Sequence, residues 1–257
     1  MENTESIKVK ESSSSNKNKS KYVLEFITEK IFMISAFVAV ISLLLIIGFV
    51  FYKGLMPFVT EGYSFIDFIF GTEWLPSSKE FGIGAMIVTS MVATVGALII
   101  GVPIGILAAI FIAEICPKKY ARVISTAVEL LAGIPSVLYG IFGLAVIVPA
   151  IQTVLSLPKG QSLLAVIIVL SIMMLPTIIS LSETSIRAVP KAYKEGSLAL
   201  GASKIETIFK VTVPAAKSGI LAGVILGIGR ALGETMAVIL VAGNSTAMPT
   251  SLLDSAR

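Results

Sequence analysis

The run SGILAGVILGIGRALGETMAVILVAG, residues 218–243, decides the fold class, because it is apolar enough to cross a membrane yet carries two charges near its centre. A helix of about 20 apolar residues spans a bilayer. An ionised side chain at that depth costs roughly 2.5–3.5 kcal/mol on insertion scales. Arg230 and Glu234 are therefore expected to face protein or a water-filled cavity rather than lipid.

The spacing within this run supports that expectation. On a continuous helix Arg230 and Glu234 would lie about 40° apart and could face one direction. Small residues that recur every four positions beside them would let a second helix approach closely; they are Gly219, Gly223, Gly227, Ala231 and Thr235. Two interpretations stay open: an ion pair that fixes subunit packing, or a cationic station for an anion crossing the membrane. The second is favoured, because ionisable residues inside membranes are usually functional and a guanidinium can donate two parallel hydrogen bonds to an oxyanion.

The composition of the whole chain indicates an integral membrane protein. Of its 257 residues 55% are hydrophobic and only 14% are charged, and the mean hydropathy is +0.94. A soluble domain of this size does not need so much apolar surface. The chain has no histidine and a single cysteine, Cys116, which excludes an intrachain disulfide, histidine metal sites and histidine-based nucleophilic catalysis. We therefore expect no catalytic site, no metal site and no cofactor.

Five apolar runs predict an all-α, polytopic membrane bundle. Residues 1–25, which are rich in Ser and Lys, are predicted to form a disordered cytoplasmic tail, and 26–257 the transmembrane domain. The expected spans are about 31–52, 83–115, 127–151, 162–181 and 218–243.

The distribution of basic residues predicts the orientation. With the N-terminus in the cytoplasm, fifteen Lys and Arg lie on the inner side and four on the outer side, as the positive-inside rule requires. This topology accounts for the basic residues, and no basic domain suggests a nucleic-acid partner. Three acidic residues at the inner ends of spans are expected to be interfacial rather than part of a pathway; they are Glu114, Glu129 and Glu183.

The longest internal polar stretch, residues 183–217, predicts two short helices. Pro190 suits a helix start and Gly201 a helix stop. The S-x-x-E pattern at 203–206 is a capping box that would open the second helix, and Pro214 would end it. Such a loop could pack on the membrane or on the chain's own spans, or it could be a docking element for a cytoplasmic partner.

The spacing within this loop resembles the EAA motif of the permeases of ABC importers. That motif runs E-A-A, three residues, G, nine residues, I-x-L-P, and the spacing fits at every step. Gly-Ser replaces Ala-Ala, and two valines replace Ile and Leu. The matching residues are Glu195, Gly196, Ser197, Gly201, Val211, Val213 and Pro214. The resemblance implies that they form the coupling helix, which sits in a groove of an ATPase subunit.

Three further segments are similar to phosphate-importer permeases of the PstC type. They are AGIPSVLYG at 132–140, GIGRALGETMAVILVAGNS at 227–245 and MPTSLLD at 248–254. The resemblance covers about 25–257 and implies the fold of type I ABC-importer (MetI-like) permeases; the paralogue PstA is the main confusion. That family carries a sixth span after the MPTSLLD-like segment. Since it is not seen here, we expect a fragment or a truncated variant.

The resemblance also implies a function and its partners. The chain would be a non-enzymatic permease subunit of an ATP-driven importer for inorganic phosphate in a prokaryotic cell membrane, with Arg230 and Glu234 in the pathway. Its partners would be a PstA-like second permease subunit, two PstB-like ATPase subunits, an extracytoplasmic PstS-like phosphate-binding protein and membrane lipid. The alternatives are a permease for molybdate or sulfate, or a non-transporting subunit that signals phosphate status.

Overall fold

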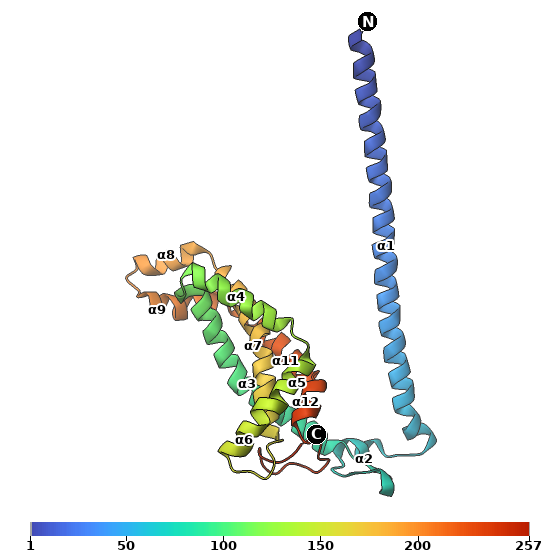
Figure 1. Cartoon of the computed structure of the whole chain (residues 1–257), viewed down its shortest axis with the longest axis vertical. Coiled ribbons are helices and arrows are strands. Elements are labelled where there is room, and N and C mark those ends of the chain that lie inside the picture. The colour runs from blue at the N-terminus through green and yellow to red at the C-terminus, as the bar shows by residue number, and fades with distance from the viewer. Residues whose placement is uncertain (1, 257) are drawn as a thin grey trace. The chain divides into compact units, whose positions relative to one another are not determined.

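The structure is a computed structural model that describes residues 21, 22 and 24–256 in full. Of residues 2–20 and 23 it gives only their place in a helix, and residues 1 and 257 lie outside it. The chain divides into two units, Met1–Phe65 and Ile66–Arg257. Its elements are almost all helical (Figure 1).

The first unit is one long helix, α1 (Glu2–Thr60). Its apolar stretch Leu24–Thr60 is long enough to cross a membrane, and none of its best window is buried within the protein. A helical stretch that is apolar on all sides is suited to lipid. The predicted span 31–52 lies inside this stretch. The predicted disordered tail, 1–25, falls mostly outside the fully described residues and stays a prediction.

The second unit begins with α2 (Phe65–Phe70) and a small hairpin. Strands β1 (Trp74–Leu75) and β2 (Glu80–Phe81) are antiparallel and are joined by the 3-10 turn Pro76–Ser78. Trp74 pairs with Phe81, and their rings meet edge to face with centroids 5.4 Å apart. Such an aromatic pair stabilises a hairpin that is too short to be stable alone.

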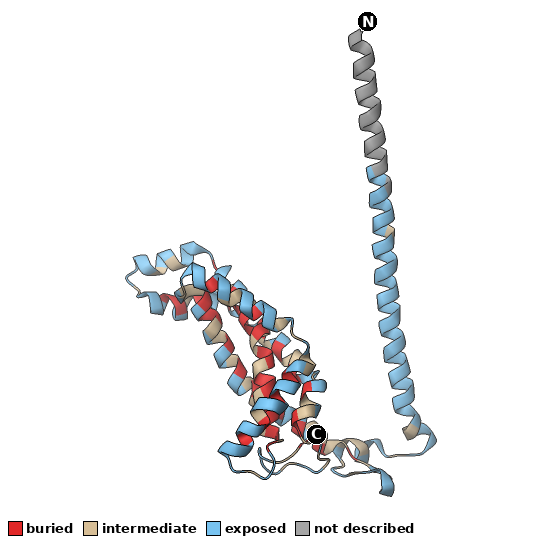
Figure 2. Ribbon diagram, in the orientation of Figure 1, coloured by how far each residue is buried: buried red, intermediate tan, exposed pale blue. Residues whose placement is uncertain are grey.

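Three helices form the centre of the second unit. They are α3 (Gly84–Ile110), which continues as a π-helix over Phe111–Ile115, α7 (Leu163–Arg187) and α11 (Lys217–Leu232). Helix α7 is apolar on all sides and lies between the others, so that most of its residues are buried (Figure 2). The predicted spans 83–115 and 162–181 correspond to α3 with its π-helix and to α7.

Glycines let these helices approach closely. A Cβ at Gly101 of α3 would lie 3.3 Å from the backbone oxygen of Ser171, and the Ser171 hydroxyl donates to Ala97 O at 3.3 Å. A Cβ at Gly223 of α11 would lie 3.2 Å from Leu181, and one at Gly227 would lie 3.1 Å from Ile178. The prediction that the glycine line of residues 218–243 admits a second helix is therefore confirmed, and that helix is α7.

The predicted span 127–151 is divided in the structure. Helix α4 (Lys118–Ala132) ends at Gly133, and a new apolar helical run begins after Pro135 with α5 (Ser136–Phe142), the π-helix Gly143–Ile147 and α6 (Val148–Val154). The proline has no N–H and keeps the residue before it out of a helical conformation. The Tyr139 hydroxyl donates to Leu131 O at 2.7 Å and ties the two helices across the break.

The last predicted span, 218–243, is also divided, between α11 and α12 (Met236–Val241). Before it, α8 (Lys191–Ala199), α9 (Lys204–Thr207), the π-helix Ile208–Thr212 and α10 (Val213–Ala215) form the loop that leads into α11. The segment 204–215 meets α11 at a bend of 69°. Among the described residues, four helices are long and apolar enough to cross a membrane, or five if this bent pair is one span.

The segment after α12 caps the start of α7. The first N–H groups of α7 donate outside the helix, from Leu163 to Asp254 O at 3.0 Å and from Leu164 to Leu252 O at 2.7 Å. The Asp254 carboxylate holds this segment in shape by accepting from the N–H groups of Thr250 and Ser251, both at 2.8 Å. The first N–H groups of a helix have no partner within the helix, so this segment supplies the partners that α7 lacks.

The hydrogen bonds to Asp254 predict a pH dependence. The Ser251 N–H, followed by the hydroxyl and N–H of Thr250, lowers the pKa of the Asp254 carboxyl below its usual value of 3.8. The stabilisation is therefore present above pH 3.8 and is lost as the pH falls through the lower folded pKa. We expect amide protection at Leu163 and Leu164, corrected for intrinsic exchange, to fall on acidification in the wild type. In Asp254→Asn it should be low at every pH; equal protection in the two proteins at pH 6 would contradict this.

Candidate functional site

The two charged residues of 218–243 do not lie on one helix. Helix α11 ends at Leu232, and Gly233, Glu234 and Thr235 form the turn before α12. Glu234 Oε1 accepts a hydrogen bond from the N–H of Ala237 at 3.0 Å and so caps the start of α12. The expectation of a continuous helix with its charges 40° apart is thus corrected, because a glycine and a capping carboxylate interrupt the helix.

Arg230 remains at the end of α11 and is half-buried. Its Nη1 donates to the hydroxyl of Thr177 on α7 at 3.5 Å, a long hydrogen bond. The described residues contain no ion pair between Arg230 and Glu234, whose side chains have different partners. Most of the guanidinium donors therefore have no acceptor within the described part of the chain.

A small cavity lies beside Glu234. It has a volume of about 60 Å³, enough for about four water molecules. Helices α3, α7, α11 and α12 line it, with the polar side chains Thr89, Ser90, Thr94 and Glu234. The hydroxyl groups of Thr89 and Thr94 donate to carbonyls of their own helix at 2.7 and 2.8 Å. The rest of the lining is apolar, so Glu234 and these three hydroxyl-bearing residues are the polar members of the cavity wall.

The segment AGIPSVLYG at 132–140 has a packing role at this site. A Cβ on Gly140 of α5 would lie 2.8 Å from the Cα of Ala237 on α12. Contacts below 3.0 Å essentially never occur for a real Cβ, so the two backbones can meet only at a glycine. Helix α5 therefore holds the segment that carries Glu234.

We expect Gly140→Val to destabilise the second unit, because the added side chain would force α12 away from α5. Overpacking of this kind costs about 1–3 kcal/mol. The thermal unfolding midpoint in detergent should fall clearly. The matched control is Gly48→Val on α1, where an added Cβ meets nothing within 4 Å. Equal effects of the two substitutions would contradict the close approach of α5 and α12.

Two local hydrogen-bonding motifs order the loop that resembles the EAA motif. At the end of α8, Gly201 has φ +87° and its N–H donates to Leu198 O, while the Ala202 N–H donates to Ser197 O. This is a Schellman motif, in which glycine takes the left-handed position. Ser203 and Glu206 then form the predicted capping box at the start of α9. Helix α8 begins after Pro190, as predicted.

The matched residues lie along one continuous segment. Glu195 and Gly196 are exposed on α8, and nothing lies within 4 Å of a Cβ added at Gly196. The Ser197 hydroxyl contacts that of Thr207 on α9 at 3.0 Å. Val211 and Val213 are half-buried, and the exposed Pro214 lies inside the final short helix, which ends one residue after it. Pro214 was expected to end the helix; the bend occurs at Ala216 instead.

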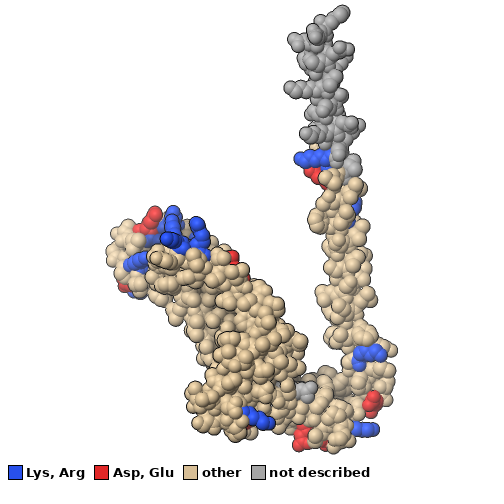
Figure 3. Space-filling model, in the orientation of Figure 1, with Lys and Arg blue, Asp and Glu red and all other residues tan. Residues whose placement is uncertain are grey.

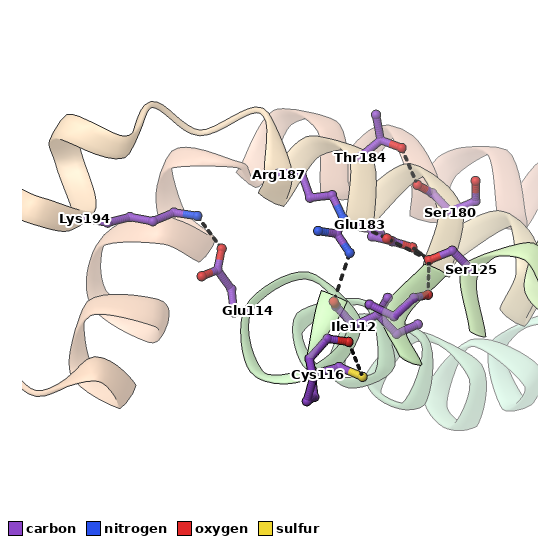
Figure 4. Close-up of polar contacts among 11 residues, drawn as sticks. Ile112, Glu114, Cys116, Ser125, Ser180, Glu183, Thr184, Arg187 and Lys194 are labelled. Carbon is purple, nitrogen blue, oxygen red and sulfur yellow. Dashed lines mark hydrogen bonds and ion pairs between the residues drawn. The ribbon is translucent and has the colours of Figure 1, made fainter. Parts of the chain in front are cut away.

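Basic and acidic side chains gather at the end of the second unit that contains α8 (Figure 3). Beneath them, Arg187 Nε pairs with Glu183 Oε1 at 2.8 Å, and the Ser125 hydroxyl lies 2.9 Å from both oxygens of Glu183 (Figure 4). Arg187 Nη2 also donates to Ile112 O at 3.0 Å. In a π-helix that carbonyl would accept from residue 117, but Pro117 has no N–H. Arg187 therefore supplies the donor that the proline cannot.

A second ion pair joins α8 to the spans. Lys194 Nζ contacts Glu114 Oε1, and Glu114 lies on the π-helix that continues α3 (Figure 4). Glu114 and Glu183 were predicted to be interfacial, but their side chains are only 12% and 11% exposed and both are paired with cations. The i, i+4 spacing of Glu183 and Arg187 could have indicated the first pair. No sequence signal indicates the second. Glu129 is exposed, as expected of an interfacial residue.

Comparison with known proteins identifies the family. The family described as "Binding-protein-dependent transport system inner membrane component" matches residues 101–255. The chain is 45% identical over 206 residues to the probable ABC transporter permease protein YqgH of Bacillus subtilis, covering 79% of this chain and 67% of that protein. It is 37% identical over 249 residues to the phosphate transport system permease protein PstC of Mesorhizobium japonicum, covering 88% and 75%.

A third relative and a solved structure are also similar. The PstC protein of Xylella fastidiosa (strain 9a5c) is 36% identical over 207 residues, which covers 73% of this chain and 64% of that protein. An inward-facing structure of the MetNI methionine ABC transporter aligns with a TM-score of 0.45 and 23% identity, covering 59% of this chain and 68% of that one. The apolar helices and the matched family make this an all-α, multi-pass cell-membrane protein of the permease type, as predicted. The chain belongs to the family of binding-protein-dependent transport system inner membrane components.

Proposed function

We propose that this chain is the transmembrane permease subunit of an ATP-driven importer of inorganic phosphate. The observation that carries the proposal is the 37% identity to a PstC protein over 249 residues. The family match over residues 101–255 includes Arg230 and Glu234. YqgH, which is more similar over a shorter stretch, is named only as a probable ABC transporter permease and is compatible with this substrate.

Arg230 is the residue proposed to meet the anion. Its guanidinium is half-buried, and one long hydrogen bond to Thr177 leaves most of its donors open. A guanidinium stays charged at physiological pH and can donate two parallel hydrogen bonds to a phosphate. Glu234, across the break between α11 and α12, would repel a bound anion and so prevent it from binding too tightly.

The cavity beside Glu234 is proposed to form a second part of the pathway, in addition to Arg230. Thr89, Ser90, Thr94 and Glu234 are its polar lining residues, and Ser90 is exposed. Because the chain supplies only part of the pathway wall, a second permease subunit of the PstA type is proposed to complete the pathway. An extracytoplasmic binding protein of the PstS type would deliver phosphate to it.

The loop of α8 and α9 is proposed to dock an ATPase subunit of the PstB type, one of two in the complex. Apolar side chains there are exposed, notably Tyr193, Leu198 and Leu200, the last of them 90%. Exposed apolar groups on an ordered loop are typical of a protein interface. The basic residues at this end support a cytoplasmic position for the loop by the positive-inside rule. With four predicted spans before the loop, the N-terminus would lie on the same side. ATP binding would close the ATPase subunits and move the loop.

The test is uptake of labelled phosphate at low external concentration, in cells that carry this chain with its partner subunits and in cells that lack it. We expect uptake that unlabelled phosphate blocks and that sulfate and molybdate do not. Competition by molybdate or sulfate would assign a different oxyanion. Assembly with the ATPase but no uptake would favour a subunit that signals phosphate status.

A further inference from the structure

Helix α8 is bonded to the rest of the described chain by few side chains. None of its residues is buried. Among the described residues its side-chain hydrogen bonds are two: the Ser197 hydroxyl to Thr207, which stays within the loop, and Lys194 to Glu114, which reaches the spans. The Lys194–Glu114 pair is therefore the one side-chain hydrogen bond in the described chain between α8 and the π-helix that continues α3.

The Lys194–Glu114 pair is shielded from water. The side chains are 24% and 12% exposed, whereas those of the pair Lys210–Glu206 in the same loop are 74% and 49% exposed. An exposed pair contributes little, because water and salt screen it. Removing one partner of a shielded pair is much more disruptive, because it leaves a desolvated charge without compensation. The ion pair can therefore keep α8 attached to the π-helix that continues α3 when α8 moves.

Helix α3 and its π-helical continuation lead from the Lys194–Glu114 contact to the cavity beside Glu234. Glu114 lies on the π-helix that directly continues α3, and Ser90 near the other end of α3 lines the cavity. At 1.5 Å per residue the two positions are about 35 Å apart along the helix. The π-helix that carries Glu114 is also bonded to α7, because Arg187 donates to Ile112 O while it pairs with Glu183. A displacement at Glu114 is therefore passed to α3 and α7 together.

We propose that the Glu114–Lys194 ion pair is the contact through which movement of α8 reaches α3 and the cavity beside Glu234. The inference rests on the proposed function, in which α8 docks an ATPase subunit. The two residues are positioning residues: they touch neither nucleotide nor transported anion. The proposal differs from the docking of the loop itself, because it predicts variants that bind the ATPase normally and still fail to transmit its movement.

The test uses the full complex and a reporter that does not depend on the substrate. The background is Cys116→Ser with Ser90→Cys, which leaves one thiol, placed at the cavity. The rate of labelling by a water-soluble maleimide is measured without nucleotide and with ATP plus vanadate. In this background we expect the nucleotide to change the rate by about fivefold or more, the lower range of ordinary allosteric coupling. Lys194→Ala and Glu114→Gln should abolish the change while the ATPase subunits still co-purify and hydrolyse ATP.

Three variants separate transmission from general damage. Lys194→Arg keeps the cation and should keep the nucleotide response. The exchanged pair, Glu114→Lys with Lys194→Glu, should restore it. Lys210→Ala removes only the exposed pair and should leave it unchanged. A full response in Lys194→Ala would overturn the proposal, as would no response in the background protein. Absence of phosphate uptake by the wild-type complex, together with an intact labelling response in the background protein, would contradict the proposed function and leave the ion pair's role standing.

Discussion

Uptake of phosphate by the Arg230→Gln variant is expected to fall by about 100-fold or more while the complex still assembles. The two hydrogen bonds that a guanidinium gives to an anion are worth roughly 1.5–3 kcal/mol each, and every 1.4 kcal/mol is about tenfold in affinity. Glutamine is shorter, keeps one donating amide group and carries no charge. The measurement is the initial rate of labelled phosphate uptake, normalised to the amount of assembled complex.

Two variants control for indirect effects of this change. Arg122→Gln removes a guanidinium that is exposed on α4 and should leave uptake near the wild-type rate. Arg230→Lys keeps the charge but not the fork, and should retain only part of the uptake. If Arg230→Gln instead prevents the subunits from co-purifying, the residue fixes subunit packing and the role in the pathway is wrong.

The second large effect is expected from Gly201→Pro, which should leave the complex without coupled ATP hydrolysis. Proline fixes φ near −65°, whereas Gly201 has φ +87°, and it also removes the N–H that donates to Leu198 O. The Schellman motif between α8 and α9 cannot form, and the docking surface loses its shape. The measurement is the ratio of ATPase activity with and without phosphate-loaded binding protein, which should fall to one.

The control for Gly201→Pro occupies the same position. Asparagine tolerates the left-handed conformation better than other residues with a side chain, and a Cβ at Gly201 meets nothing within 4 Å. Gly201→Asn should therefore keep most of the stimulation. Normal coupling in Gly201→Pro would contradict the role of the loop.

The sequence predicted those parts of the fold that depend on residues adjacent in the chain. Helices α3 and α7 and the capping box at Ser203 follow from contiguous residues and were predicted. At 133–135 the proline predicts a kink within one span, whereas the structure has a full break; the break at 233–235 was not predicted. A hydropathy average is hardly changed by a single proline or glycine. In the sequence Glu234 looks like a charge inside a span, and only its hydrogen bond from the Ala237 N–H shows that it caps a helix.

The candidate site shows the same limit. Arg230 and Glu234 stand out in the sequence because charges are rare within apolar runs. In the structure Glu234 lines the cavity, and Arg230 lies on α11, one of the helices that line it. Lys194 and Glu114 are 80 positions apart, and each is an ordinary charged residue near the end of an apolar run. Only tertiary packing brings them together, so no local pattern could have paired them.

The cap on α7 has a consequence for synthesis of the chain. Leu163 and Leu164, at the start of the central helix, receive their hydrogen-bond acceptors from residues 252–254. At 5–20 residues per second the ribosome needs roughly 5–20 s to make the intervening chain. Throughout that interval the most buried helix of the protein has an open end. Nascent chains arrested before residue 252 should therefore be more sensitive to quality-control proteases than chains arrested a few residues later.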